Sequence, residues 1–204
     1  MIGRLVKGID LRHYGSGNVG ASNIFASVSK FWVVPHSLFE ILVKGASPIC
    51  IGLLVMDMER SSMTLAGAGL LAIAGHNWMV FLKFTGGRGI AVASGALLAL
   101  APWELTIFVG LAMGGYLVFK SAGTWVFISL LLLPVWSWLF NEPESITWFC
   151  IGIIGLVSLK RLLSNWTPLP ADMPWQRVLF NRLIKDRDTD RREDWVHRTP
   201  AGPK

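Results

Sequence analysis

Two stretches of the sequence combine closely spaced glycines with side chains that could bind an anion. The first is DLRHYGSGNVGASN (10–23) and the second is GHNWMVFLKFTGGRG (75–89). Glycines let backbone N–H groups approach a phosphate, and a helix that starts directly after such a loop adds its unpaired N–H groups. Arg12 and Arg88 could contribute charge in bidentate contacts. Neutral hydrogen bonds could come from Ser16, Asn18, Ser22 and Asn23. Both stretches therefore predict phosphate binding.

Other kinds of catalytic site are not indicated by the sequence. A Walker-type loop requires GxxxxGK[ST] and a nucleophile elbow requires GxSxG, and neither pattern occurs. We expect no metal site and no cofactor, because no two histidines have the spacing of a ligand pair: His13, His36, His76 and His197. Taken singly, each glycine cluster is also compatible with an ordinary turn, and His76 with a role in helix packing or capping.

The composition indicates what kind of protein carries these loops. The chain has 204 residues, of which 52% are hydrophobic and 16% charged, and its mean hydropathy is +0.50. Soluble domains carry about 25% charged residues, so a soluble enzyme, a disordered chain and a disulfide scaffold are disfavoured. Cys50 and Cys150 lie in apolar stretches and are expected to be inert. The net charge of +6 suits the cytoplasmic ends of membrane helices, and no nucleic acid partner is expected.

The apolar stretches predict an all-α, polytopic membrane helical bundle with about six transmembrane helices. A helix needs about 20 apolar residues to cross a bilayer. The candidates are residues 31–56, 63–82, 90–101, 105–119, 123–140 and 146–159. The third and fourth candidates are short, so they could instead form one bent span.

The distribution of positive charge favours six spans over five. With the N-terminal segment inside the cell, six spans place 17 of the 19 Lys/Arg inside, while Arg60 lies outside and Lys44 lies within a span. Merging the third and fourth spans would move the C-terminal tail outside and reverse this bias. The outside loops would be 57–62, 102–104 and 141–145. We therefore predict a multi-pass protein of the cell membrane, with both glycine loops and the tail in the cytoplasm.

Two further features of the sequence bear on the organisation of the chain. Glu40 and Lys44 lie four residues apart within the first span. Ions at membrane depth pair or face a polar interior, so this pair either ties helices together or has a functional role.

The last forty residues hold eight Lys/Arg and six Asp/Glu. We predict a membrane-embedded part at 1–164 and a charged cytoplasmic tail at 165–204.

The two glycine-rich stretches together resemble the first two motifs of the bacterial acyl-phosphate:glycerol-3-phosphate acyltransferase family. The resemblance extends over residues 2–163, and ILVKGASP around Lys44 also resembles a family feature. It implies an integral membrane enzyme that transfers a fatty acyl group from acyl phosphate to glycerol 3-phosphate and forms lysophosphatidic acid for phospholipid synthesis. The family has seven spans, and residues 1–9 match only the cytoplasmic end of the first, so we expect either that the start of the sequence is misplaced or that the first helix is missing.

The resemblance also implies roles for individual residues. Ser16 matches the serine of the first motif, and His76 matches the histidine of the second, so both are candidate catalytic residues. The first motif implies a substrate-binding loop that includes Arg12, Gly15, Gly17, Asn18, Gly20 and Asn23. The second motif implies a glycerol-3-phosphate loop made of Gly86, Gly87, Arg88 and Gly89.

The sequence departs from the family pattern at several positions. Ala26 stands where the family has an arginine, Arg88 where it has a lysine, and Met79 where it has a proline. In the third motif, Gly155 and Ser158 stand where the family has a histidine and an asparagine. These differences leave the predicted fold intact, and they motivate a hypothesis other than catalysis.

Three functions therefore remain open from the sequence. The leading hypothesis is acyl transfer between glycerol 3-phosphate and acyl phosphate at the cytoplasmic surface of the lipid membrane, without metal or organic cofactor. The second is a homologue that binds phosphate or lipid but has lost catalysis. The third is a small transporter, because Glu40 and Lys44 lie within the membrane.

Overall fold

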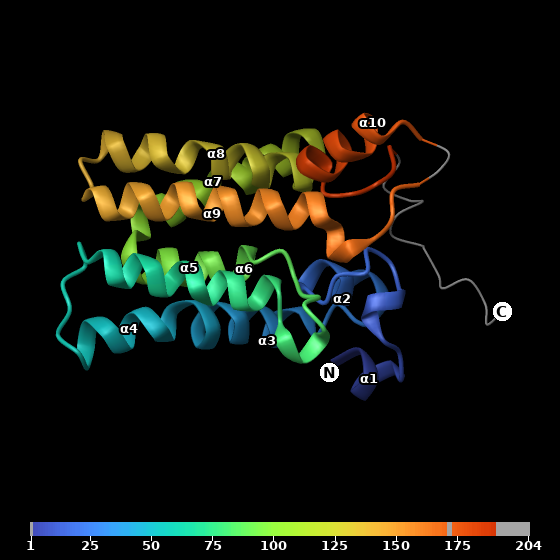
Figure 1. Ribbon diagram of the computed structural model, residues 1–204, viewed down its shortest axis with the longest axis horizontal. Coiled ribbons are helices and arrows are strands. Elements are labelled where there is room, and N and C mark those ends of the chain that lie inside the picture. Colours follow the sequence, from blue (N-terminus) through green and yellow to red (C-terminus); the bar gives the residue numbers. More distant parts are fainter. Residues whose placement is uncertain (1, 171–172, 191–204) are drawn as a thin grey trace.

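A computed structural model of the chain describes residues 2–170 and 173–190. Within these residues the regular structure is entirely helical, and the only strand-like feature is an isolated bridge between Met79 and Thr85. The long helices lie side by side in a bundle, and the short helices α1, α2 and α10 gather at one end of it (Figure 1). The predicted all-α bundle is confirmed.

Ten α-helices form the described part of the chain. They are α1 (Ile2–Lys7), α2 (Ala21–Ser27), α3 (Val33–Leu38), α4 (Ser47–Leu54), α5 (Met63–Asn77), α6 (Ile90–Leu100), α7 (Pro102–Phe119), α8 (Ala122–Leu139), α9 (Glu144–Leu163) and α10 (Trp175–Phe180). A π-helical segment, η2 (Phe39–Ala46), joins α3 to α4, and a second one, η5 (Asn181–Lys185), follows α10. Shorter 3-10 turns occupy Leu11–His13, Val80–Leu82 and Ser164–Trp166.

Four helices are long and apolar enough to cross a membrane. They are Val33–Leu54, Pro102–Phe119, Ala122–Leu139 and Glu144–Leu163, which correspond to four of the six predicted spans. The other two predicted spans form the shorter helices α5 and α6. Helix α6 has 11 residues, which at about 1.5 Å per residue is about half the thickness of a bilayer core. Six of its residues are buried among neighbouring helices.

The chain reverses direction between the third and fourth predicted spans rather than continuing as one helix. Ala101 leaves the helical conformation, with φ −146° and ψ 67°, and Pro102 starts α7. A proline at this position favours a helix start because its missing N–H would have no partner there. The alternative of one bent span is thus not what the structure adopts, whereas the number of six membrane crossings stays a prediction.

The predicted outside loops gather at one end of the bundle. Arg60, which precedes α5, donates to the carbonyl oxygen of Leu100 over 2.8 Å and forms an ion pair with Glu142, which precedes α9. The two glycine loops lie at the opposite end, where Asn165 contacts Gly17 and Gly86 after α9 has ended. The alternation of helix directions therefore brings both candidate motifs to the same end.

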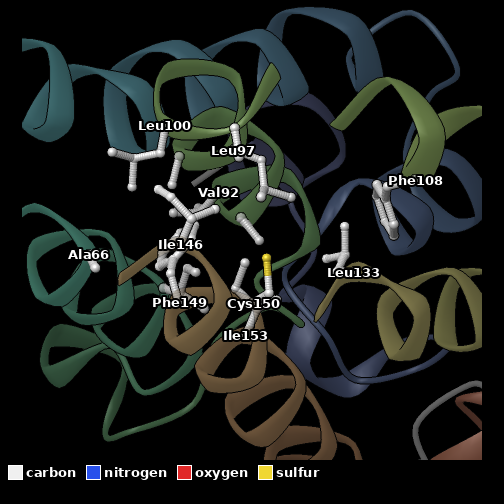
Figure 2. Close-up of a cluster of buried hydrophobic side chains, with 14 of the residues drawn as sticks. Ala66, Val92, Leu97, Leu100, Phe108, Leu133, Ile146, Phe149, Cys150 and Ile153 are labelled. Atoms are coloured by element: carbon white, nitrogen blue, oxygen red, sulfur yellow. The ribbon is translucent and has the colours of Figure 1, made fainter. Parts of the chain in front are cut away.

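A buried apolar cluster holds α5, α6, α8 and α9 together beneath that end. Figure 2 shows Val92 and Leu97 of α6 close to Ile146, Phe149 and Cys150 of α9. All five side chains are inaccessible to solvent. Cys150 is a free thiol within this cluster, as the sequence predicts for a cysteine that serves only in packing.

Segment η2 touches α6 backbone to backbone, and glycines on both sides permit this approach. A Cβ atom added to Gly95 would lie 1.9 Å from the carbonyl oxygen of Ile41, and one added to Gly45 would lie 2.3 Å from that of Val92. Small residues permit such close packing between membrane helices. The contact fixes η2, and with it Glu40, beside the helix that follows the second glycine loop.

Residues 173–190 pack against the membrane bundle, although the sequence predicts them as part of a tail. Segment η5 contacts α8 and α9, and the guanidinium of Arg161 in α9 donates to the carbonyl oxygens of Gly123 and Leu183 over 3.1 and 2.7 Å. Residues 171–172 and 191–204 lie outside the described residues. The division of the chain at residue 164 stays a prediction.

The glycine contact between η2 and α6 leads to a prediction about stability. Gly95→Ala should lower the melting temperature of the purified protein in detergent, because the added methyl group would overlap a backbone oxygen that cannot move alone. We expect a cost of about 1–3 kcal/mol, which is typical of overpacking. Gly110→Ala in α7 is the matched control, because no atom lies within 4 Å of its added Cβ. Equal melting temperatures for the two variants would contradict the close contact.

Candidate active site

The two glycine loops meet through the side chain of one asparagine. The amide oxygen of Asn165 accepts from the Gly86 N–H over 3.1 Å, and its Nδ2 donates back to the Gly86 carbonyl over 3.0 Å. The same Nδ2 lies 3.3 Å from the carbonyl oxygen of Gly17 and 2.9 Å from Oδ1 of Asn18. Loops about 70 residues apart in the sequence are thereby joined into one structure.

The first glycine loop is folded around the buried side chain of Asn23. Its Nδ2 donates to the carbonyl oxygens of Leu11, Tyr14 and Asn18 at 3.0, 2.9 and 2.7 Å. Gly15 has φ +53°, and a Cβ there would lie 2.3 Å from Oδ1 of Asn23. Asn23 therefore determines the shape of the loop, and glycine is needed where the loop passes over this side chain.

Arg12 is occupied by its neighbour Asp10. The two side chains are 2.6 Å apart, and Asp10 also pairs with Arg4 at 2.8 Å. The hydrogen bond from Arg12, helped by that from Arg4, lowers the pKa of Asp10 well below its usual range. Arg12 does not line the cavity described below. The structure thus places this predicted phosphate ligand in the support of the loop.

The second glycine loop lies across the end of α5. A Cβ on Gly86 would lie 2.1 Å from the carbonyl oxygen of His76, and one on Gly87 would lie 2.2 Å from Nε2 of the same histidine. Gly89, with φ +78°, ends the loop directly before α6. The helix expected after this loop is therefore present, and the two central glycines allow the loop to rest on His76.

A cavity of about 620 Å³ opens between these loops and the ends of the neighbouring helices. Its polar lining includes seven of the predicted site residues, namely Ser16, Asn18, Gly20, Asn23, His76, Arg88 and Gly89. Apolar walls are contributed by side chains such as Phe25, Ile41 and Val126. Of the remaining predicted residues, Gly15, Gly17, Gly86 and Gly87 shape the loops without lining the cavity. The cavity combines a polar end with apolar walls.

Buried cations concentrate positive charge at the polar end of the cavity. Arg88 is 8% exposed, and its Nη1 donates to the carbonyl oxygen of Lys160 over 2.9 Å, while its Nε lies 2.6 Å from Oδ1 of Asp186. Arg161, which follows Lys160 in α9, also lines the cavity. The buried ammonium of Lys160 donates to the carbonyl oxygen of Asn77. Among these groups only Asp186 carries negative charge, so an anion is favoured here.

Asn18 lies between two groups that both offer hydrogen bonds. In one orientation its amide oxygen accepts from Nδ2 of Asn165 over 2.9 Å. In the other it accepts from Nε and Nη2 of Arg88 over 3.1 and 3.2 Å. One amide oxygen cannot serve both neighbours at once, so the Asn18 amide bonds either Asn165 or Arg88. A phosphate oxygen beside Arg88 could accept from the same guanidinium.

Glu40 links the π-helical segment to His76. Its Oε1 lies 2.7 Å from Nζ of Lys44, and its Oε2 lies 2.5 Å from Nδ1 of His76. Both Glu40 and His76 are buried and line the cavity. The pair that the sequence leaves as either structural or functional thus ties two helices together and faces the candidate site.

Sequence reasoning missed several polar residues of the site, among them Asn165 and Asp186. Asn165 lies two residues after the end of α9, where an asparagine is typical of an ordinary helix end. Asp186 belongs to a stretch of alternating charges that is typical of a solvated tail. Neither position carries a local signal of a site. In the described residues no group of three or more His, Cys, Asp or Glu side chains could hold a metal ion, and His197 lies outside them.

The chain is similar in sequence to proteins of a known family. The family described as "Glycerol-3-phosphate acyltransferase" matches residues 1–168. "Glycerol-3-phosphate acyltransferase 4" of Dehalococcoides mccartyi (strain CBDB1) is 35% identical over 211 residues, covering 100% of this chain and 88% of that protein. A protein of the same family name from Desulforamulus reducens is 35% identical over 76% of this chain and 75% of its own length.

Two solved structures are also similar to the chain. Both are crystal structures of PlsY (YgiH), an integral membrane glycerol 3-phosphate acyltransferase. Its glycerol 3-phosphate form has a TM-score of 0.71 and 27% identity, covering 78% of this chain and 80% of that one. Its lysophosphatidic acid form has a TM-score of 0.66 and 25% identity, covering 72% and 73%. Together with the helical bundle and the joined glycine loops, these similarities show that the chain belongs to the glycerol-3-phosphate acyltransferase family of multi-pass membrane proteins.

Proposed function

We propose that this protein transfers a fatty acyl group from acyl phosphate to glycerol 3-phosphate, forming lysophosphatidic acid for phospholipid synthesis. The observation that carries the proposal is the union of both glycine loops by Asn165 beside a cavity that contains Arg88 and Arg161. Both substrates are phosphorylated, and the polar end of the cavity offers arginine side chains and hydrogen-bond donors. The apolar walls suit the beginning of an acyl chain.

The phosphate of glycerol 3-phosphate is assigned to the space between Arg88 and Asn18. Arg88 supplies charge, and Asn18 and the loop N–H groups supply hydrogen bonds. Ser16, which lines the same cavity, orients the glycerol hydroxyl group. Gly20, Asn23 and Gly89 complete the lining, while Gly15, Gly17, Gly86 and Gly87 give the loops their shape. Arg12 is assigned to the support of the first loop through Asp10.

The chemical step requires the two substrates to be aligned, because acyl phosphate is already an activated acyl donor. The glycerol hydroxyl oxygen attacks the acyl carbon, a new C–O ester bond forms, and the bond from the acyl carbon to the phosphate oxygen breaks. The released phosphate takes the hydroxyl proton, so no covalent enzyme intermediate is required. Holding the two substrates in line can supply about 7–11 kcal/mol of the barrier reduction. His76, which faces the cavity, is the side-chain alternative as proton acceptor.

The site is assigned to the cytoplasmic face of the cell membrane. The bundle end that carries both glycine loops belongs to the side on which 17 of the 19 Lys/Arg fall, and positive residues favour the cytoplasmic side. The acyl chain would extend from the cavity between helices whose outer faces contact lipid. This orientation gives the site access to a soluble phosphorylated substrate and to the bilayer that receives the product.

One observation favours a second function, a homologue that binds phosphate or lipid without catalysis. Ala26 lines the cavity at the position where the resemblance implies an arginine, so this wall lacks one positive charge. Arg161 and Lys185 also line the cavity and supply positive charge from other elements. Catalysis therefore remains the leading proposal, and product formation separates the two functions.

The direct test is acyl transfer in membranes that contain the full chain, with labelled glycerol 3-phosphate and acyl phosphate. We expect labelled lysophosphatidic acid. Ser16→Ala should reduce its formation about a hundredfold, because the glycerol hydroxyl group that accepts the acyl chain loses its alignment. Ser61→Ala is the control, because Ser61 lies at the opposite end of the bundle, where its hydroxyl donates to Glu59. Substrate binding without product, in folded wild-type protein, would support the second function instead.

Removal of the Asn165 side chain should disable the site while leaving the fold in place. Asn165 has φ +55°, a conformation that glycine adopts readily, so Asn165→Gly removes the amide without straining the backbone. We expect a higher KM for glycerol 3-phosphate and at least a tenfold loss of kcat/KM. Asn141→Gly is the matched control, because Asn141 also has positive φ and lies at the other end of the bundle. A loss of the same size in both variants would refute a specific role for Asn165.

A further inference from the structure

A segment that follows the region matched by the family contributes to the candidate site. The family match ends at residue 168, whereas Lys185, Asp186 and Arg187 line the cavity. These three residues lie at and after the end of η5. The cavity is therefore partly built by a portion of the chain that lies beyond the residues matched by the family model.

This segment is anchored to the bundle by two buried arginines. Arg161 donates to the carbonyl oxygen of Leu183 over 2.7 Å. Arg182 donates to that of Leu162 over 3.1 Å and pairs with Asp188 at 2.6 Å. Buried guanidinium groups that donate to backbone carbonyl oxygens hold those backbone segments in place. The position of the residues around 186 is thus fixed by contacts of Arg161 and Arg182 that do not involve the Asp186 side chain.

Asp186 uses this position to place a carboxylate on the arginine of the glycine loop. Its Oδ1 lies 2.6 Å from Nε of Arg88 and 4.0 Å from Nε of Arg161. Its side chain is 25% exposed, in contrast to 8% for Arg88 and 2% for Arg161. One carboxylate thus faces two guanidinium groups at the polar end of the cavity. A carboxylate and a phosphate bind a guanidinium through the same kind of charged hydrogen bond.

We propose that Asp186 sets the affinity of the phosphate subsite by competing with the substrate phosphate for Arg88. The inference rests on the proposed function, which assigns the phosphate to Arg88. In the free protein the carboxylate neutralises a buried arginine, which lowers the cost of keeping that charge away from water. When a phosphate enters, the partly exposed carboxylate rotates away, while Arg161 and Arg182 keep the backbone of the segment in place.

A competing role for Asp186 and a purely supporting role predict opposite effects of removing its charge. If the carboxylate competes with phosphate, its removal strengthens anion binding, because the phosphate no longer displaces a bound group and no longer meets a nearby like charge. If the carboxylate only holds Arg88 in position, its removal weakens binding. The sign of the change in affinity therefore decides between the two roles.

The test is calorimetric titration of glycerol 3-phosphate, and separately of inorganic phosphate, into the purified full chain in detergent. Asp186→Asn should bind glycerol 3-phosphate about tenfold more tightly than the wild type, which corresponds to about 1.4 kcal/mol. Asp186→Ser should change the affinity in the same direction. Glu59→Gln removes one negative charge from an exposed residue at the opposite end of the bundle and should leave the affinity unchanged.

Unchanged or weaker binding in the folded Asp186 variants would overturn the inference. Arg88→Gln separates this failure from failure of the proposed function. Loss of binding in Arg88→Gln, with unchanged affinity in Asp186→Asn, would leave the phosphate at Arg88 and remove only the role of Asp186. Wild-type affinity in Arg88→Gln would remove both proposals. Melting temperatures close to that of the wild type establish that each variant is folded.

Discussion

The pairing between the Asn165 amide and the backbone of Gly86 is the contact on which the site depends. It joins the second glycine loop to residues 17 and 18 of the first loop through one side chain. Neither loop alone surrounds an anion, and the loops belong to segments that only the bundle brings together. Because a single amide provides both a donor and an acceptor to Gly86, it fixes the orientation of the second loop as well as its distance from the first.

Burial of charge is the second constraint on this end of the bundle. Arg88, Lys160 and Arg161 are buried, and each satisfies donors on backbone carbonyl oxygens of neighbouring elements. These contacts hold the three side chains in place, and Arg88 and Arg161 line the cavity. Asp186 balances part of that charge in the free protein. A phosphate would enter a site whose charges are already arranged, so binding would require little reorganisation.

The sequence was sufficient to predict the helical membrane bundle, the two glycine loops and their position at one end. Hydropathy is a property of each segment, and the charge bias is a sum over loops, so both can be read without knowing the fold. The glycine loops can be recognised from the spacing of their glycines. The pairing of Arg12 with Asp10 and the docking of Asp186 on Arg88 depend on side-chain contacts that no spacing reports. Hydropathy already predicts that the helix at 90–101 is shorter than a full span, whereas its burial among neighbouring helices is not visible in the sequence pattern.

In the proposed function, the joined loops hold a substrate phosphate against Arg88. The most direct measurement is an experimental structure of the full chain with glycerol 3-phosphate bound. We expect phosphate oxygens within hydrogen-bonding distance of the Arg88 guanidinium and of Asn18, with the Asn165 contacts to Gly86 intact. Phosphate bound outside the cavity, or bound with the two loops separated, would contradict this assignment.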